Sequence, residues 1–349
     1  AGQNGPGATN LVTGLAQAYA AFSPVVSIAG ALSSEHVYRD AFQEVDQQAL
    51  FKPITKKTWT VTHAARVPEM FREAFRTALT PRRGPVQLNL PRDVLSEQCD
   101  FGRFQRPEEN RAQNLPQADN QLIIEAAKIL HGAAKPVIVV GGGIKNCGGH
   151  ADVLALAEKL NSPIILAPGH GDAIPHGHPL NSGQMGPRGN VVASRLAKEA
   201  DVILALGTRL GFNSTFYSYD NINSDADIIQ VELEPTAIGR YFPIRLGIWA
   251  DARAVAGQLT NALEKVEIRE EVVAWTHAYR DERAAYLSQR DSAADDREIP
   301  IQPSGLYRVL RSVLPKNAIV TMDAGTLCLQ ATDALEYHQP PGLFTPLDF

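Results

Sequence analysis

The sequence predicts an α/β fold with parallel sheets, and two observations carry that prediction. Short apolar runs that suit strands alternate with stretches whose apolar residues recur at helical spacing, which is the pattern of βα units. The run Val202–Leu206 is apolar without interruption, as expected for a strand that is covered on both faces. At 349 residues the chain is long enough for two or three domains.

The first segment, residues 1–105, shows this alternation directly. Apolar residues such as Leu11 and Leu15 recur at helical spacing, and Pro24 cannot continue a helix. The Gly84 turn precedes a second apolar strand. The expected elements are a helix over 8–22, a strand over 25–29, a helix over 64–79 and a strand over 85–90.

Two further segments follow. Residues 106–119 are polar and predict a linker, and residues 120–265 resume the alternation as a central domain. The charge-rich residues 266–302 predict one helix followed by a linker over Asp291–Asp296. Residues 303–349 begin a third domain that ends soon after the Asp323–Thr326 turn. The expected helices are 120–131, 150–161, 189–199, 251–265, 270–290 and 303–314, and the expected strands are 136–140, 163–166, 201–206, 227–233, 246–250 and 318–322.

Composition excludes several classes of protein. The chain is 44% hydrophobic and 20% charged, with a formal net charge of -5, and it lacks the Lys/Arg block of a nucleic-acid-binding protein. No apolar run approaches the ~20 residues of a membrane span. Cys99, Cys147 and Cys328 lie far apart without metal-ligand spacing, which predicts a reducing, cytoplasmic location and no zinc site.

The most informative motif is the turn Gly5-Pro6-Gly7 followed by a helical pattern that contains Asn10. A glycine turn feeding a helix can bring backbone close to a flat ligand, although many such turns are turn chemistry alone. Such a turn normally follows a strand, and almost nothing precedes this one. We therefore expect the chain to be a piece of a longer enzyme.

Other motifs have commoner structural explanations. Asp40–Asp46 is most simply a solvated acidic helix, and Lys56 and Lys57 are expected to face solvent on a strand, although one could turn inward. Gly141–Gly143 follows a strand but lacks the dinucleotide fingerprint. Gly207–Arg209 and Glu232–Pro235 end strands where a nucleotide could rest, but such ends are often only loops.

Histidines gather between residues 169 and 179. His170, Asp172, His176 and His178 are interrupted by glycines and prolines, so they lack the fixed spacing of a zinc-binding helix. We expect surface or cavity-lining histidines rather than a metal site.

Taken in order along the whole chain, these segments resemble the thiamine-diphosphate-dependent enzymes of the acetolactate synthase superfamily. The resemblance implies a partial pyrimidine-binding domain over 1–105, a Rossmann-like central domain over 120–265 and the start of a diphosphate-binding domain over 303–349. Its signposts are Gly5–Asn10, Asp40–Asp46, Arg83–Asp93, Gly207–Arg209 and Asp323–Thr326.

The resemblance also implies roles for individual residues. Gln43, with Phe42 beside it, matches the glutamine that reaches the active site, so these two are the catalytic candidates. The implied contacts to the cofactor are Pro6, Gly7, Asn10 and Gln43 on the pyrimidine side, and Asp323, Gly325 and Thr326 on the diphosphate side.

Within the superfamily, the loop 169–180 and Ile54–Lys56 look most like the sulfoacetaldehyde acetyltransferases. This likeness implies cleavage of a small aldehyde or 2-oxo substrate and transfer of an acyl group, with magnesium holding the diphosphate. The loop 183–189 differs from that of the FAD-using synthases, which argues against FAD. Family members form their sites between subunits, so a homodimer or homotetramer is expected.

The resemblance implies two motifs that residues 1–349 do not contain. In the family, the catalytic glutamate precedes the Gly-Pro-Gly turn, and the Gly-Asp-Gly…Asn magnesium motif follows a segment like 303–349. We therefore expect residues 1–349 alone to bind thiamine diphosphate weakly and not to turn over. The alternatives are an acetolactate synthase, a 2-hydroxyacyl-CoA lyase, and a non-catalytic homologue that serves as a binding module.

Overall fold

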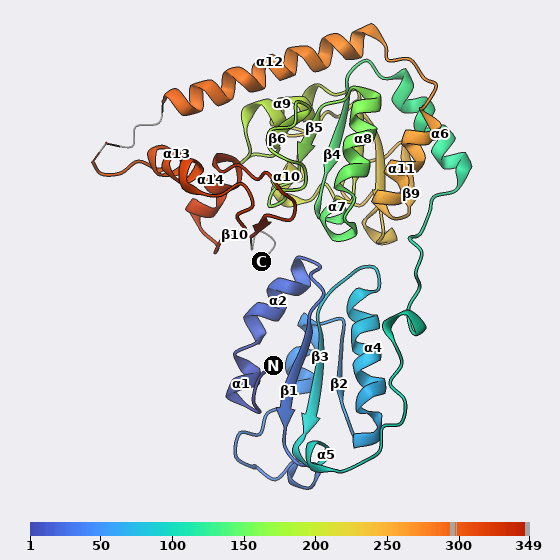
Figure 1. Cartoon of the computed structure of the whole chain (residues 1–349), viewed down its shortest axis with the longest axis vertical. Coiled ribbons are helices and arrows are strands. Elements are labelled where there is room, and N and C mark those ends of the chain that lie inside the picture. Colours follow the sequence, from blue (N-terminus) through green and yellow to red (C-terminus); the bar gives the residue numbers. More distant parts are fainter. Residues whose placement is uncertain (294–296, 298, 346–349) are drawn as a thin grey trace. The chain divides into compact units, whose positions relative to one another are not determined.

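The computed structural model describes residues 1–293, 297 and 299–345. The described chain divides into two compact units, residues 1–114 and a second unit that begins at Leu115 (Figure 1). Both are α/β with parallel sheets, as predicted.

The first unit contains a three-stranded parallel sheet in the order β1-β3-β2. Leu88 and Leu90 of the central strand pack with Met70 and Ala74 of the helix α4 in one hydrophobic core. The elements are α1 (Pro6–Thr9), α2 (Val12–Ala20), β1 (Val26–Ala31), α3 (Gln47–Phe51), β2 (Lys57–Thr60), α4 (Val67–Leu79), β3 (Val86–Pro91) and α5 (Arg92–Ser96).

The second unit is built on a six-stranded parallel sheet in the order β6-β5-β4-β7-β8-β9. Its strands are β4 (Pro136–Val140), β5 (Ile164–Leu166), β6 (Asn181–Gln184), β7 (Val202–Leu206), β8 (Asp227–Glu232) and β9 (Leu246–Trp249). Its helices are α6 (Asn120–Gly132), α7 (Gly142–Cys147), α8 (His150–Leu160), α9 (Val191–Glu199), α10 (Phe212–Thr215), α11 (Ala252–Ala262) and α12 (Glu270–Ser292).

Helices cover both faces of this sheet. Ile138 and Val140 point into a core with α6, α8 and α11, whereas Val137 and Val139 point into a second core with α9 and α12. Because side chains alternate along a strand, a sheet covered on both faces needs apolar residues at every position. The prediction from the uninterrupted apolar runs is confirmed.

A smaller segment completes the second unit. It contains α13 (Pro303–Val313), β10 (Val320–Thr321), α14 (Thr326–Ala334) and β11 (Leu343–Phe344), with β10 and β11 paired in parallel. Tyr307, Leu335 and Leu343 are buried in its own small core. The long helix α12 lies beside α13 (Figure 1).

Several boundaries differ from the predictions. The expected helix 8–22 is divided at Asn10 and Leu11 into α1 and α2, the expected strand 318–322 forms ladder pairs only at Val320–Thr321, and α12 continues to Ser292. Of the linker predicted over Asp291–Asp296, residues 294–296 lie outside the described residues.

The strand β6 was not predicted because its sequence, Asn-Ser-Gly-Gln, is polar. Asn181 donates to the carbonyl oxygens of Ile174 and Pro175, and Gln184 donates to Thr332 Oγ1 at 3.2 Å. These tertiary hydrogen bonds satisfy the buried side chains. No local sequence pattern predicts these hydrogen bonds.

Candidate functional site

The Gly-Pro-Gly turn does follow an extended segment. Gly2 N–H donates to the Ile28 carbonyl at 2.8 Å, and the Gly2 carbonyl accepts from Gly30 N–H at 3.0 Å. Gly2 therefore forms a parallel bridge beside β1. The strand–turn–helix order that a ligand-cradling turn needs is present in the first unit.

The turn contacts the loop that contains Gln43. Gly5 has a φ of 61°, and a Cβ placed on it would lie 2.7 Å from Gln43 Cβ. Only glycine allows this conformation and this close approach together. Two of the segments singled out by the sequence, 5–10 and 40–46, therefore meet in one place.

Residues 37–46 form a strained loop, and the simplest prediction of an acidic helix over Asp40–Asp46 is wrong. Tyr38, Asp40 and Gln43 have left-handed φ values of 64°, 53° and 65°. Such conformations cost energy in residues other than glycine, and they cluster at binding and catalytic sites. Asp46 instead caps α3 by accepting from Ala49 N–H at 3.0 Å.

Glu44 holds this loop in shape. Its carboxylate accepts from Tyr38 N–H at 2.6 Å and from Ala41 N–H at 3.0 Å. These hydrogen bonds favour the ionised form and lower the pKa of Glu44 below its usual range. Phe42, fixed on the same loop, is 86% exposed.

Two residues of this site, Asn4 and Gln47, were missed by the sequence reasoning. Gln47 Nε2 donates to Asn4 Oδ1 at 3.0 Å and to the Gly30 carbonyl at 2.9 Å, which ties the turn to the end of β1. Gln47 is buried, and its Oε1 atom has no hydrogen-bond partner among the described residues. No sequence signal distinguishes Gln47 from the other glutamines nearby.

The surface beside the turn offers free polar groups. Pro6 and Asn10 are exposed, Gly7 is half-buried, and Gln43 is half-buried. The carboxamides of Asn10 and Gln43 make no hydrogen bond within the part of the chain that the structure describes. Amides that are free to donate and accept, next to a flat apolar proline, suit a polar heteroaromatic ring.

Replacing Gly5 by alanine is expected to destabilise the first unit by about 2 kcal/mol, because the new Cβ collides with Gln43 and the left-handed φ disfavours a side chain. Urea denaturation measures this change. Gly14→Ala is the matched control, since Gly14 lies inside α2 with open space around it. That control should be more stable by up to about 1 kcal/mol, and equal stability of the two variants would contradict the prediction.

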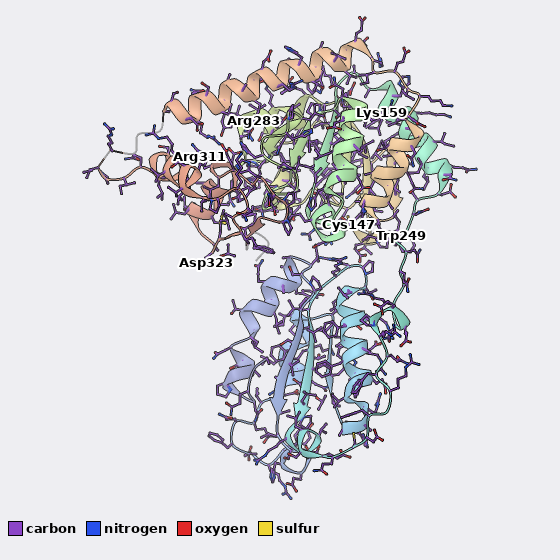
Figure 2. The ribbon with its side chains drawn as sticks, viewed as in Figure 1. Cys147, Lys159, Trp249, Arg283, Arg311 and Asp323 are labelled. Carbon is purple, nitrogen blue, oxygen red and sulfur yellow. The ribbon has the colours of Figure 1, made fainter. Side chains whose placement is uncertain are left out.

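The second candidate group lies in the second unit, at the turn between β10 and α14. Asp323, Gly325 and Thr326 are all exposed, and Figure 2 labels Asp323 at the edge of the second unit. Asp323 Oδ1 accepts from Ala324 N–H at 2.8 Å, and Gly325, with a φ of 144°, precedes the first turn of α14. Free N–H groups at a helix start suit an anion such as a phosphate.

The glycines at the carboxyl end of β4 pack against another loop. A Cβ on Gly143 would lie 2.6 Å from Gly207 Cα, and one on Gly141 would lie 2.5 Å from the Gly207 carbonyl oxygen. These glycines let the start of α7 touch the loop after β7 backbone to backbone. Their packing accounts for them without a phosphate.

The histidine loop does not gather its side chains around one point. Asp172 pairs with Lys145 at 2.7 Å, His176 faces Glu336 at 3.5 Å, and His178 faces Glu158 at 3.2 Å. Within the described residues, no group of three or more His, Cys, Asp or Glu side chains could hold a metal ion.

Lys56 is not solvent-facing, contrary to the simplest prediction. Its Nζ atom donates to the carbonyl oxygens of Thr77 and Thr80 at 2.6 and 2.8 Å, so it caps the carboxyl end of α4. Burial lowers the pKa of Lys56. Lys57 lies over the Trp59 ring at 5.0 Å.

Two family models match this chain. The model described as "Thiamine pyrophosphate enzyme, N-terminal TPP binding domain" matches residues 1–50, and the model described as "Thiamine pyrophosphate enzyme, central domain" matches residues 123–259. Together they match more than half of the chain. The chain therefore belongs to the thiamine pyrophosphate enzyme family, whose cofactor is also called thiamine diphosphate.

The individual relatives within this family carry two kinds of name. The chain is 33% identical over 377 aligned positions to a probable sulfoacetaldehyde acetyltransferase of Rhizobium meliloti, covering 100% of this chain and 62% of the relative. It is 32% identical to a sulfoacetaldehyde acetyltransferase of Roseovarius nubinhibens, covering 99% of this chain and 60% of the relative. A probable acetolactate synthase large subunit of Methanocaldococcus jannaschii is 34% identical, with 92% and 55% covered.

The chain thus spans about 60% of the length of the curated relatives it matches.

Among the helices of the described residues, none is long and apolar enough to cross a membrane.

Proposed function

We propose that the protein containing residues 1–349 is a thiamine-diphosphate-dependent acyltransferase of the sulfoacetaldehyde acetyltransferase type. One observation supports this most directly. The Gly5 turn and the strained Gln43 loop pack together in the domain that matches the family's N-terminal cofactor-binding domain. This contact sets the Gln43 loop against the turn that begins α1, and Asn10 follows directly after that helix.

The residues present fit the pyrimidine side of thiamine diphosphate. Asn10 and Gln43 supply free amide groups, Pro6 and Gly7 supply the turn beside them, and the buried Gln47 Oε1 atom is an acceptor without a partner among the described residues. Bound thiamine diphosphate supplies a carbon nucleophile for attack on a carbonyl group. In this proposal Gln43 orients the reacting groups, and the exposed Phe42 shields them from water.

On the diphosphate side, the start of α14 at Gly325 and Thr326 would hold an anionic oxygen through backbone N–H groups. The Asp323 carboxylate is compatible with a hard cation such as magnesium. Magnesium belongs to the proposal for the whole protein, and we assign it no ligand set within the described residues.

The proposal includes a cytoplasmic homodimer or homotetramer. Cys99, Cys147 and Cys328 are free thiols, which fits a reducing compartment. Tyr38 and Phe42, 95% and 86% exposed, stand on the loop that Glu44 holds through hydrogen bonds to the Tyr38 and Ala41 amides, and a subunit interface would bury them. Light scattering after size-exclusion chromatography measures the mass of the assembly, and a monomer at micromolar concentration would remove this part of the proposal.

The test of the reaction is phosphate-dependent release of sulfite from sulfoacetaldehyde by the full-length protein, with thiamine diphosphate and magnesium added. Gln43→Ala is expected to lower kcat at least tenfold, because an oriented donor is lost at the reacting centre. Gln48→Ala is the matched control, since Gln48 is exposed on the neighbouring helix α3. An active protein whose Gln43→Ala variant keeps full activity would exclude Gln43 from this role.

Acetolactate synthesis is the second candidate, because relatives of similar identity are named acetolactate synthases. It is tested by condensation of pyruvate in the same preparation. Condensation without sulfite release would replace the first proposal by the second. Failure of both reactions in the full-length protein would favour a non-catalytic binding module.

A further inference from the structure

A buried ion pair in the second unit, Lys145 with Asp172, is hydrogen-bonded to the peptide backbone of residues 342 and 343. Lys145 Nζ lies 2.7 Å from Asp172 Oδ1, and the two side chains are 14% and 0% exposed. Lys145 comes from α7, which follows β4, and Asp172 comes from the loop that follows β5. Because β4 and β5 are parallel neighbours, their carboxyl ends bring the two residues together.

The remaining hydrogen bonds of this pair go to the main chain of the C-terminal segment. Asp172 Oδ2 accepts from Gly342 N–H at 2.8 Å and from Leu343 N–H at 2.9 Å. Lys145 Nζ donates to the Leu343 carbonyl at 2.8 Å. Both polar groups of Leu343 are therefore held by one ion pair, while its side chain is completely buried.

A buried ion pair by itself is weak evidence for stability, because desolvation offsets the attraction between the charges. The arrangement here differs, since each charge also satisfies a backbone group that would otherwise be buried without a partner. The place is also informative. The strand order of the sheet reverses between β4 and β7, which is where open α/β sheets bind ligands, and the pair lies beside this point, at the carboxyl ends of β4 and β5.

We propose that Lys145 and Asp172 form a backbone clamp that fixes the segment 320–345 on the carboxyl edge of the central sheet. Two backbone hydrogen bonds connect the clamped residues to the strand that precedes the exposed Asp323–Thr326 turn. Val320 N–H donates to the Gly342 carbonyl at 2.8 Å, and Met322 N–H donates to the Phe344 carbonyl at 3.0 Å. The Asp323–Thr326 turn follows directly, so Lys145 and Asp172 act as positioning residues for it.

This inference goes beyond the proposed function. The existence of the clamp depends only on contacts within the second unit. Its consequence for catalysis, the placement of a diphosphate-binding turn, rests on the proposed function. Hydrogen exchange tests whether the clamp exists, and cofactor-dependent activity of the same variants tests its consequence for catalysis.

The experiment is hydrogen exchange of the full chain, followed by mass spectrometry of peptides that cover 319–323 and 339–345. Asp172→Ala is expected to raise the exchange rates of the Gly342 and Leu343 amides, and of their strand partners Val320 and Met322, at least tenfold. The central strands β7 and β8 should keep their protection. Unchanged rates at Gly342 and Leu343 would overturn the clamp.

A double variant separates the clamp from a simple need for charge balance. Lys145→Met with Asp172→Leu removes both charges and restores an apolar contact, which often recovers global stability. The clamp predicts that the exchange rates at Gly342 and Leu343 nevertheless stay raised, because their acceptor is gone. Full recovery of protection in the double variant would show that the pair only balances charge. Since the double variant leaves no unpaired buried charge, it keeps the test valid if Asp172→Ala does not fold.

Asp251 and Lys159 provide matched controls. Asp251 is 2% exposed and also accepts from two backbone amides, those of Arg253 and Ala254, at the start of α11. Lys159 donates to the Glu264 carbonyl, and Figure 2 shows it on the other side of the second unit from Asp323. Asp251→Ala and Lys159→Met should change exchange locally and leave 320–345 protected. Loss of protection there in either control would contradict a clamp specific to Lys145 and Asp172.

Discussion

Replacement of Gly143 by alanine is expected to destabilise the second unit by about 3 kcal/mol. A Cβ at this position would lie 2.6 Å from Gly207 Cα and 3.0 Å from the Gly207 carbonyl oxygen. These neighbours are backbone atoms, so no side chain can rotate away, and α7 must separate from the loop after β7. The midpoint of urea denaturation, followed by fluorescence, measures the loss.

Gly257→Ala is the control for this prediction. Gly257 lies inside α11, and its added Cβ would meet only Asp152 Oδ1, at 4.0 Å. Alanine is favoured over glycine in a helix interior by up to about 1 kcal/mol, so this variant should be slightly more stable than the parent. Similar midpoints for the two variants would mean that the Gly143–Gly207 contact is looser than the structure shows.

The stability of the second unit is expected to fall as pH falls from 7 to 5. Burial, reinforced by the nearby charge of Lys145, lowers the pKa of His170 to about 4, and burial lowers the pKa of His176 to about 4 against the attraction of Glu336. The ordinary value near 6.5 applies in the unfolded chain. Below pH 6.5 the unfolded state therefore binds protons that the folded state does not, which favours unfolding.

The expected loss between pH 7 and pH 5 is about 2 kcal/mol for each histidine, because one pKa unit corresponds to 1.36 kcal/mol. Urea denaturation at a series of pH values measures it. His170→Asn and His176→Gln should each flatten the dependence by one histidine's share. His277→Asn, at an exposed position of α12, should keep the full dependence of the parent. A parent whose stability is constant across this range would show that both histidines titrate alike in the folded and unfolded chain.

Much of the fold was predictable because it follows from local patterns. Strands such as β4 and β7 are apolar at every position, and helices such as α8 and α11 carry regular apolar faces. The strand β6 was not predictable, since its buried polar residues are satisfied by distant partners such as Thr332. The expected helix 8–22 was too simple a prediction, because helical periodicity alone did not indicate its break at Asn10 and Leu11.

Some residues of the candidate site were also predictable from the sequence, and others were not. The family resemblance marked Pro6, Asn10 and Gln43 from short motifs, and their roles in cofactor binding stay predictions. Asn4 and Gln47 carried no local signal, because their importance comes from a hydrogen bond that spans 43 residues. The left-handed backbone at Gln43 likewise becomes visible only in three dimensions.

The sequence by itself determined the class of this protein, since apolar periodicity gives parallel α/β units and the ordered motifs give the thiamine pyrophosphate enzyme family. Only the tertiary structure decided what each motif contacts. It placed Gly5 against Gln43, Gly143 against Gly207, and Asp172 against the backbone of Leu343. The physical reason is that periodicity is a property of neighbouring residues, whereas close packing and buried hydrogen bonds join residues that are far apart in the chain.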